Sequence, residues 1–499
     1  MGVVVGTAAL VLVGGAAATL GRATGVRVSP ERLVVGYRTH ADLAAALHGT
    51  GAVVLRRLPA LRAAEVRTLE PAARLRRAPG IRFVSRPVAR GAAAEPALAV
   101  TPSSPAGLEW EYHGTHEDGV PDSVLRSAAS VRIAVIDTGA DLTAPDLAAK
   151  SPTSYNTRTG GTDVRDTNGH GTFVASIAAG SVTNGEGIAG FGGDAQLLVV
   201  KAGPGDGTFT DVDEAAGITY AIDHGARIVN LSFGGAGTTS IERNAVRYAI
   251  DHGALVVAAA GNEFGVGNPV EYPAALLQPV GSDGAGGAGL SVGASTQTGT
   301  RARFSNTGSW ISLAAPGENV LGDLSSLSPA SMYPRSPLPG SQSGVYGYSS
   351  GTSFAAPQVA GAAALVWAAN PQLTAQQVAQ ILKQTASGGG RWTPDLGFGV
   401  IDVAAAVAAA QAGQPGVLLS GNRVRSKLHL TWSGDTSRYT LTLTSAGASR
   451  TVLSASPNTS AWVRLKPGRA YVFTVSAIDP SGATSATSAP LTVALPSKH

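Results

Sequence analysis

The chain contains no cysteine among its 499 residues. That absence excludes a disulfide scaffold, thiol catalysis, a zinc–thiolate site and a thioether lipid anchor, and it is compatible with either redox compartment. Charged residues make up only 14% and hydrophobic residues 44%. This balance is typical of a globular chain and is too mixed for a multispanning membrane protein. The length predicts two or three domains, and the 64 glycines and 29 prolines indicate many tight turns.

Positive charge is concentrated near the start of the chain. The stretch 22–90 carries 14 arginines against four acidic residues, whereas the net charge of the whole chain is only +4. The remainder is therefore acidic, and we expect the two parts to dock on each other electrostatically. A nucleic-acid-binding arm is the alternative interpretation. The arginines alternate with periodic apolar residues, as a folded domain requires, so we expect no nucleic-acid partner.

The first 25 residues are interpreted as a secretion signal or a single membrane anchor. Residues 2–20 carry no charge and are followed by Arg22, and their length suits either role, although no positive segment precedes them. We therefore expect a protein that is secreted or held at the cell surface.

Residues 26–90 are predicted to form a small α+β domain. Strand-like alternation at 32–38 and 51–58 flanks a helix-like stretch, and a second helical stretch rich in Ala, Arg and Glu leads to a last strand at 81–88. Residues 91–107 are small, Pro-rich and nearly uncharged, which indicates an exposed linker.

Residues 108–412 alternate short apolar runs with helix-like stretches. The runs at 131–137, 195–202, 226–233 and 254–261 are too apolar for a sheet that is wet on one face. The rhythm predicts an α/β domain in which helices cover both faces of a parallel sheet. Residues 322–345 are rich in Ser, Pro and Gly and are interpreted as a surface insertion.

Residues 417–495 offer only short alternating strands, which predict a separate β-sandwich. The segment resembles a fibronectin type III module through Trp432, the Tyr439-x-Leu441 step and the Leu465-x-Pro467-Gly468 sequence. Nothing in it suggests chemistry, so we expect an accessory or substrate-positioning role.

Three polar residues of the α/β domain are candidates for catalysis. Asp137 ends an apolar run, at the carboxyl end of a strand, where the sites of parallel sheets form. His170 lies between two glycines before an apolar helical stretch, and Ser353 lies in the sequence GTSFAAP, at the start of another helix-like stretch. Taken singly, these residues have structural explanations: a turn-opening Asp, a structural His and a helix-capping Ser.

Together the three residues resemble the catalytic triad of the subtilisin family of serine proteases, in the chain order Asp, His, Ser. An α/β-hydrolase would present Ser first, within a G-x-S-x-G elbow, and this chain has Gly351-x-Ser353-x-Ala355 instead. The resemblance spans 108–412. It implies a subtilisin-like fold and a secreted serine endopeptidase that acts on polypeptides and needs no cofactor or metal for its chemistry. It also implies that residues 26–90 are an inhibitor prodomain, removed by autoprocessing.

The resemblance also assigns residues around the triad. Asn262 becomes the side-chain donor to the oxyanion, and Glu271 stands where relatives place a residue at the floor of the pocket for P1, the residue before the cleaved bond. A carboxylate there leads to the hypothesis of a preference for basic P1 residues. Arg90 would then suit that pocket as the autoprocessing point. The other substrate-binding residues implied are Ser232, Phe233, Gly234, Ala259, Ala260 and Gly261.

The chain departs from the family pattern at Phe173, Phe354 and Gln358, and none of these changes removes a catalytic atom. The loop from Val182 to Glu186 lies where some relatives bind calcium, so a structural calcium ion is one expectation and an ordinary turn is the other. Two further functions remain open: a binding or adhesion protein with an inactive protease body, and an enzyme dedicated to processing or ligating one partner.

Overall fold

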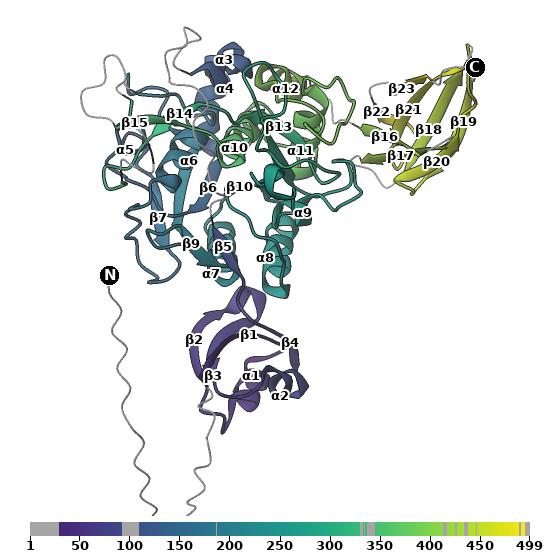
Figure 1. The fold of residues 1–499 in the computed structure, drawn as a ribbon. Coiled ribbons are helices and arrows are strands. Elements are labelled where there is room, and N and C mark those ends of the chain that lie inside the picture. The colour runs from purple at the N-terminus through teal and green to yellow at the C-terminus, as the bar shows by residue number, and fades with distance from the viewer. Residues whose placement is uncertain are drawn as a thin grey trace, which may run out of the picture.

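The computed structural model describes residues 29–91, 109–185, 187–329, 333, 335, 336, 345–412, 417–424, 427–433, 438–445, 447–488 and 491–494. They form an N-terminal domain (29–91), a central domain (109–412) and a C-terminal module (417–494). The central domain lies between the other two (Figure 1). The expected signal or anchor at 1–25, the linker from 92 onward and Glu186 lie outside the described residues.

Seven parallel strands form the sheet of the central domain, in the order β13–β12–β11–β10–β6–β8–β7. A parallel sheet is buried on both faces, which explains why its inner strands are mostly apolar, whereas the edge strand β7 is polar. The strands are β6 (Arg132–Asp137), β7 (Thr153–Asn156), β8 (Gln196–Lys201), β10 (Ile228–Leu231), β11 (Leu255–Ala259), β12 (Leu290–Ser295) and β13 (Leu313–Pro316).

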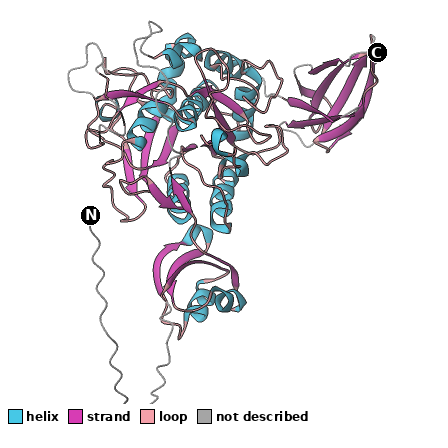
Figure 2. Cartoon of the chain, viewed as in Figure 1, coloured by secondary structure: helices cyan, strands magenta, loops and turns pink. Residues whose placement is uncertain are grey.

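Helices cover both faces of this sheet, as predicted (Figure 2). Alternate side chains of β6 enter two different hydrophobic cores: Ile133 and Val135 pack in one, Ala134 and Ile136 in the other. The first core includes α4 (Asp122–Ser127), α6 (His170–Ala179), α10 (Thr352–Ala369), α11 (Ala375–Thr385) and α12 (Val403–Gln411). The second includes α7 (Asp211–Asp223), α8 (Ser240–Asp251) and α9 (Ala274–Leu277).

Shorter elements complete the central domain. Strands β14 (Val320–Asp323) and β15 (Tyr346–Ser349) pair antiparallel and close the base of the Ser/Pro/Gly-rich segment that was interpreted as an insertion. The remaining elements are α3 (Trp110–Gly114), α5 (Pro145–Ala148), β9 (Thr208–Thr210) and the 3-10 turns η2 (Glu117–Gly119), η3 (Ala128–Ser130) and η4 (Phe264–Val266).

The N-terminal domain is a four-stranded antiparallel sheet in the order β2–β3–β1–β4 with two helices. The prediction of a single helical stretch after the second strand was wrong, because its first half forms the inner strand β3. There the carboxylate of Glu65 is buried and accepts hydrogen bonds from Arg32 on β1. The elements are β1 (Glu31–Tyr37), α1 (His40–Leu47), β2 (Val53–Leu58), η1 (Pro59–Leu61), β3 (Ala63–Thr68), α2 (Ala72–Arg77), β4 (Ile81–Ser85) and β5 (Ala89–Gly91).

This domain docks on helices α7 and α8 of the central domain (Figure 1). Leu58, Leu61 and Ala63 are buried in the same hydrophobic core as the helix residue Ile241. Nη2 of Arg56 lies 2.7 Å from Oδ1 of Asp213 at the edge of the contact. Apolar packing and a basic-to-acidic contact therefore join the two domains.

The C-terminal module consists of two antiparallel sheets that share one hydrophobic core, including Trp432, Tyr439 and Phe473. One sheet is β16–β17–β20; the other is β19–β18–β21–β22, with β23 paired to β21. The strands are β16 (Leu418–Val424), β17 (Lys427–Ser433), β18 (Tyr439–Ser445), β19 (Ala448–Ser456), β20 (Ser460–Arg464), β21 (Ala470–Ile478), β22 (Thr484–Thr487) and β23 (Leu491–Ala494).

None of the helices in the described parts of the chain has the length and apolarity needed to cross a membrane.

Candidate active site

The end of β6 and the start of α6 bring an acid and an imidazole together. Asp137 is the last residue of β6, and His170 is the first of α6. Nδ1 of His170 lies 2.8 Å from Oδ1 of Asp137, and the two side chains are only 1% and 3% exposed. The N–H of Thr138 donates to the same carboxylate oxygen at 2.7 Å. An Nδ1–H that donates to Asp137 leaves the basic lone pair of the imidazole on Nε2.

Asp166 holds the turn that carries His170, and sequence analysis missed it. Its Oδ1 accepts hydrogen bonds from the hydroxyl of Thr138 and from two backbone N–H groups of the turn before α6. Its Oδ2 accepts from both the N–H and the hydroxyl of Thr172. The buried carboxylate thus ties the residue after Asp137 to the first turn of α6. An Asp two residues before Asn-Gly is a common turn signal, which could have indicated it.

Ser353 is the second residue of α10 and lies beside this pair. The ring centroids of His170 and Phe354, the residue after Ser353, are 5.7 Å apart. The hydroxyl of Ser353 donates to the carbonyl oxygen of Ser232 at 3.1 Å, and the hydroxyl of Ser232 donates back to the carbonyl of Ser353 at 2.7 Å. The structure therefore brings the three predicted residues to the same edge of the sheet.

Asn262, just beyond the end of β11, presents an unused donor to this site. Its Oδ1 accepts from the N–H and the hydroxyl of Thr352, both at 2.9 Å. Its Nδ2 is buried and has no hydrogen-bond partner among the described residues. Because a buried amide without an acceptor is costly, this N–H group is suited to an oxygen atom of a ligand. Thr352 fixes the orientation, since its hydroxyl also accepts from the N–H of Gly261.

The predicted substrate strand from Ser232 to Gly234 is paired with the N-terminal domain. Gly234 and Gly91 exchange two backbone hydrogen bonds, of 3.2 and 3.4 Å. On its other side, β5 pairs antiparallel with β9, with Arg90 opposite Phe209. Residues 89–91 therefore form an extended strand between two strands of the central domain, which is how a peptide binds by strand addition.

Glu271 lies between the two predicted substrate-lining segments. A Cβ added to Gly234 would lie 2.6 Å from Oε2 of Glu271, and one added to Gly261 would lie 2.7 Å from its Cγ. Ala259 and Ala260, which precede Gly261, are buried. Burial and the charge of Glu263 raise the pKa of Glu271 to about 7, although nearby Arg90 acts to lower it.

The hypothesis that Arg90 occupies the pocket of Glu271 was wrong. The guanidinium contacts Glu214 of α7 at 3.2 Å and Glu242 of α8 at 2.7 Å, and it donates to the carbonyl oxygen of Gly237 at 3.0 Å. All three ionic side chains are completely buried. Sequence analysis missed both acids because acidic residues in helices usually face solvent.

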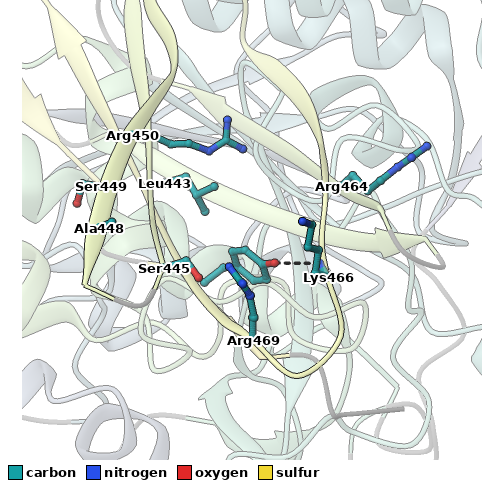
Figure 3. A pocket seen from close by; sticks show the side chains of 9 residues that line it. Leu443, Ser445, Ala448, Ser449, Arg450, Arg464, Lys466 and Arg469 are labelled. Atoms are coloured by element: carbon teal, nitrogen blue, oxygen red, sulfur yellow. Dashed lines mark hydrogen bonds between the residues drawn. The ribbon is translucent and has the colours of Figure 1, made fainter.

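A separate hollow of about 310 Å³ lies in the C-terminal module (Figure 3). Tyr471 is one of its lining residues, and its hydroxyl accepts a hydrogen bond from the backbone N–H of Lys466 at 2.9 Å. The lining contains basic side chains and no carboxylate, so it adds nothing to the arrangement of acid, imidazole and hydroxyl described above. The basic residues are Arg450, Arg464, Lys466 and Arg469.

Known proteins resemble this chain over its central domain. The model of the subtilase family matches residues 128–400. The chain is 37% identical over 282 residues to the "Thermophilic serine proteinase" of Bacillus sp. (strain AK1), covering 56% of this chain and 62% of that protein. It is 34% identical over 270 residues to "Thermitase" of Thermoactinomyces vulgaris, covering 53% and 85%. The chain thus spans less than two thirds of the first of these relatives.

The fold extends beyond the matched region. Fervidolysin from Fervidobacterium pennivorans, described as a keratinolytic enzyme related to subtilisin, superposes with a TM-score of 0.63 at 23% identity. The superposition covers 93% of this chain and 74% of that one. The predicted fold class, a subtilisin-like parallel sheet with a small preceding domain and following β-sheets, is confirmed.

Proposed function

Because the chain belongs to the subtilase family, we propose that it is a serine endopeptidase that hydrolyses polypeptides through an acyl-enzyme. The observation that carries the proposal is the buried contact of 2.8 Å between Asp137 and His170 beside the hydroxyl of Ser353. An inactive adhesion protein would have no need to keep this arrangement together with the unused Nδ2 donor of Asn262.

In the proposed reaction, Nε2 of His170 takes the proton of the Ser353 hydroxyl as Oγ attacks the peptide carbonyl carbon. Asp137 holds the Nδ1–H tautomer and stabilises the imidazolium. The same imidazolium then protonates the leaving amine, which departs with the C-terminal part of the substrate. Water activated by His170 attacks the acyl-enzyme, releases the N-terminal part as an acid and restores the hydroxyl.

Negative charge on the substrate oxygen needs donors that are already in place. Nδ2 of Asn262 is one, and the N–H of Ser353 at the start of α10 is the other. The partial positive charge at the start of this helix of 18 residues adds to both. The Asn262 amide needs little reorganisation, because the N–H and the hydroxyl of Thr352 both donate to its Oδ1 and fix its orientation.

We also propose that the N-terminal domain is an intramolecular inhibitor and that the enzyme is made as a zymogen. Support comes from β5, which pairs with β9 and with Gly234, along the strand that a substrate would use. A secreted or cell-surface location is proposed with it, since an exported protease has to stay inactive until export. Fluorescence of an exported fusion or fractionation of cells would test the location.

A basic P1 preference is proposed from the position of Glu271 between Gly234 and Gly261. The C-terminal module, which resembles fibronectin type III, is proposed as an accessory or substrate-positioning part. Deleting residues 417–499 should therefore leave the cleavage of short peptides intact and reduce only the cleavage of large substrates.

A structural calcium ion is proposed near residues 182–188. Asp146 accepts hydrogen bonds from Asn184 at 2.7 Å and from the N–H of Ile188 at 3.2 Å. Burial, and then the charge of Asp146, raise the pKa of Glu109 to about 7. A cation would relieve the repulsion between these two carboxylates, and oxygen-rich loops suit calcium.

Among the described residues, no group of three or more His, Cys, Asp or Glu side chains is arranged to share a metal. Backbone carbonyls of the loop would therefore have to supply further ligands. An unchanged melting temperature when calcium is replaced by a chelator would contradict the calcium proposal.

The activity is tested by expressing the full chain with Ser353 intact and as Ser353→Ala, and by measuring casein hydrolysis. The intact chain should lose its N-terminal domain and hydrolyse casein, and Ser353→Ala should do neither. Ser127→Ala, which changes an exposed serine of α4, is the matched control and should behave as the wild type. Equal hydrolysis by Ser353→Ala would overturn the proposal.

A further inference from the structure

A buried acidic pocket in the central domain holds the side chain of Arg90. Glu214 on α7 and Glu242 on α8 flank the guanidinium at 3.2 and 2.7 Å, and the carbonyl of Gly237 accepts a third contact. The absence of a side chain at Gly235 leaves room for the guanidinium, since a Cβ at this position would lie 2.9 Å from Nη1 of Arg90. The pocket is therefore shaped for a long, planar, multiply donating cation, the geometry of arginine.

The charges in this pocket favour a cation strongly. Burial would lower the pKa of Arg90, but the charges of Glu214 and Glu242 outweigh it and raise that pKa. Burial, followed by repulsion from Glu242, raises the pKa of Glu214 well above its usual value. The charge of a third acid, Asp211, raises the pKa of Arg90 and also that of Glu214. Without a guanidinium, these carboxylates would be buried next to one another uncompensated.

The strand register relates this pocket to the reacting bond. Gly91 pairs with Gly234 in an antiparallel arrangement, so a peptide bound in the same register would place opposite Ser232 the residue two positions after the one that pairs with Gly234. The carbonyl of Ser232 lies 3.1 Å from the hydroxyl of Ser353. A peptide in this register therefore presents to Ser353 the bond that follows the residue opposite Ser232. In such a peptide, the residue that takes the place of Arg90, directly before the partner of Gly234, is the fourth residue before that bond, the P4 position.

We propose that Glu214 and Glu242 form a selectivity pocket for arginine at P4 of polypeptide substrates, which Arg90 fills in the precursor. The proposal rests on the endopeptidase function proposed above. It assigns to α7 and α8 a role in substrate choice that is independent of Glu271 and of the triad. The pocket is rigid, because both acids lie within helices of the hydrophobic core.

The competing explanation is that the pocket only anchors the N-terminal domain. If the pocket only anchors the N-terminal domain, it acts in the precursor alone. The mature enzyme would then cleave peptides with the same kcat/KM whichever residue they carry at P4. The two explanations therefore differ in the mature enzyme, after the N-terminal domain has been removed.

The test compares two fluorogenic peptides that differ only at P4, with arginine in one and its uncharged isostere citrulline in the other. We expect kcat/KM of the mature enzyme to be at least about tenfold higher for the arginine peptide, as for a charge-assisted hydrogen bond. In the double variant Glu214→Gln, Glu242→Gln this ratio should fall to about one. Asp251→Asn, which changes an exposed acid of α8, should keep the wild-type ratio.

A ratio near one in the wild-type mature enzyme would overturn the selectivity proposal and favour the anchor. If the double variant fails to mature, the ratio measured with the wild-type enzyme still distinguishes the two explanations. Adding Arg90→Gln to the double variant removes the unpaired buried charge from its precursor. If the enzyme hydrolyses neither peptide and a fluorophosphonate does not label Ser353, the proposed endopeptidase function is itself contradicted. If Ser353 is labelled but the kcat/KM ratio of the two peptides is one, the P4 proposal is wrong and the endopeptidase function stands.

Discussion

Ser232 and Ser353 exchange two hydrogen bonds, from hydroxyl to carbonyl in each direction, at 3.1 and 2.7 Å. The strand that would bind a peptide and the helix that carries the nucleophile are thereby fixed relative to each other. The position of the reacting bond along a bound chain then follows from the strand pairing alone.

The first prediction concerns the point of maturation. If the pairing of Gly91 with Gly234 is productive, the residue opposite Ser232 is Ala93, so cleavage should fall between Ala93 and Ala94. Mass spectrometry of the mature protein should find Ala94 at its N-terminus. A mature chain that begins at Gly91 would contradict the register and would point instead to Arg90 as P1.

The second prediction concerns the oxyanion donor. Asn262→Ala removes one of two donors to the developing negative charge, so kcat should fall by about 10²- to 10³-fold while KM changes little. Steady-state kinetics on a peptide substrate measures both constants. Asn458→Ala, at an exposed position of the C-terminal module, is the control. An unchanged kcat for Asn262→Ala would exclude the role.

The third prediction concerns the support of the imidazole. Asp166→Asn replaces an acceptor of five hydrogen bonds by a group that can only partly accept them. We expect the free energy of unfolding to fall by about 1–3 kcal/mol and kcat to fall with it. Asp163→Asn, in the same loop but exposed, should have little effect. Denaturant unfolding should be measured with Ser353→Ala added, to prevent autolysis.

The fourth prediction concerns pH and P1 selectivity. The pKa of Glu271 is raised to about 7 by burial and by the charge of Glu263, so its carboxylate forms over the neutral range. The ratio of kcat/KM for P1 arginine over P1 alanine should therefore rise as the pH passes through about 7. A pH effect on the chemical step is common to both substrates and cancels in the ratio. In Glu271→Gln the ratio should be flat and lower, and a pH-dependent ratio in that variant would refute the assignment.

The same shift has an effect on stability with a defined sign. Because the folded state keeps the proton of Glu271 up to about 7 and the unfolded chain releases it near 4.5, this residue makes folding less favourable as the pH rises through that window. Glu271→Gln should remove that part of the pH dependence.

The fifth prediction concerns Lys383, which is buried and donates to the carbonyl of Gly284 at 2.8 Å. Burial lowers the pKa of Lys383 from 10.5 to about 7. The unfolded chain therefore binds a proton that the folded chain lacks between these values, and stability should rise with pH across that window. Lys383→Met should flatten this rise. Denaturant unfolding at several pH values, again with Ser353→Ala added, measures it, and an equal slope in Lys383→Met would contradict the prediction.

Sequence alone was sufficient for the parallel sheet and for the residues that the structure gathers at one edge of it. Asp137 follows the apolar run Ile133–Ile136, and His170 and Ser353 lie in the first turns of helices. The resemblance of this chain order to the subtilisin family then placed the three together. Strand β3 was missed because AAEVRT has the composition of a helix. Its conformation depends on partners on both sides and on the pairing of Glu65 with Arg32, which are tertiary effects.

Arg90 shows a different limit. Its position before a linker singled out Arg90 in the sequence, but the pocket that holds its side chain could not be predicted. Which acid it meets depends on the pairing of Gly91 with Gly234 and on how α7 and α8 pack together, and neither is encoded in a local pattern. Glu214 and Glu242 lie within helices, where a carboxylate is usually expected to face solvent.

The most direct test of the account is to react the mature protein with a fluorophosphonate and to locate the adduct by mass spectrometry. We expect one adduct per chain, on Ser353, and its loss in His170→Ala, because the imidazole must activate the hydroxyl. No adduct, or an adduct on another serine, would contradict the claim that Asp137, His170 and Ser353 act as one catalytic unit.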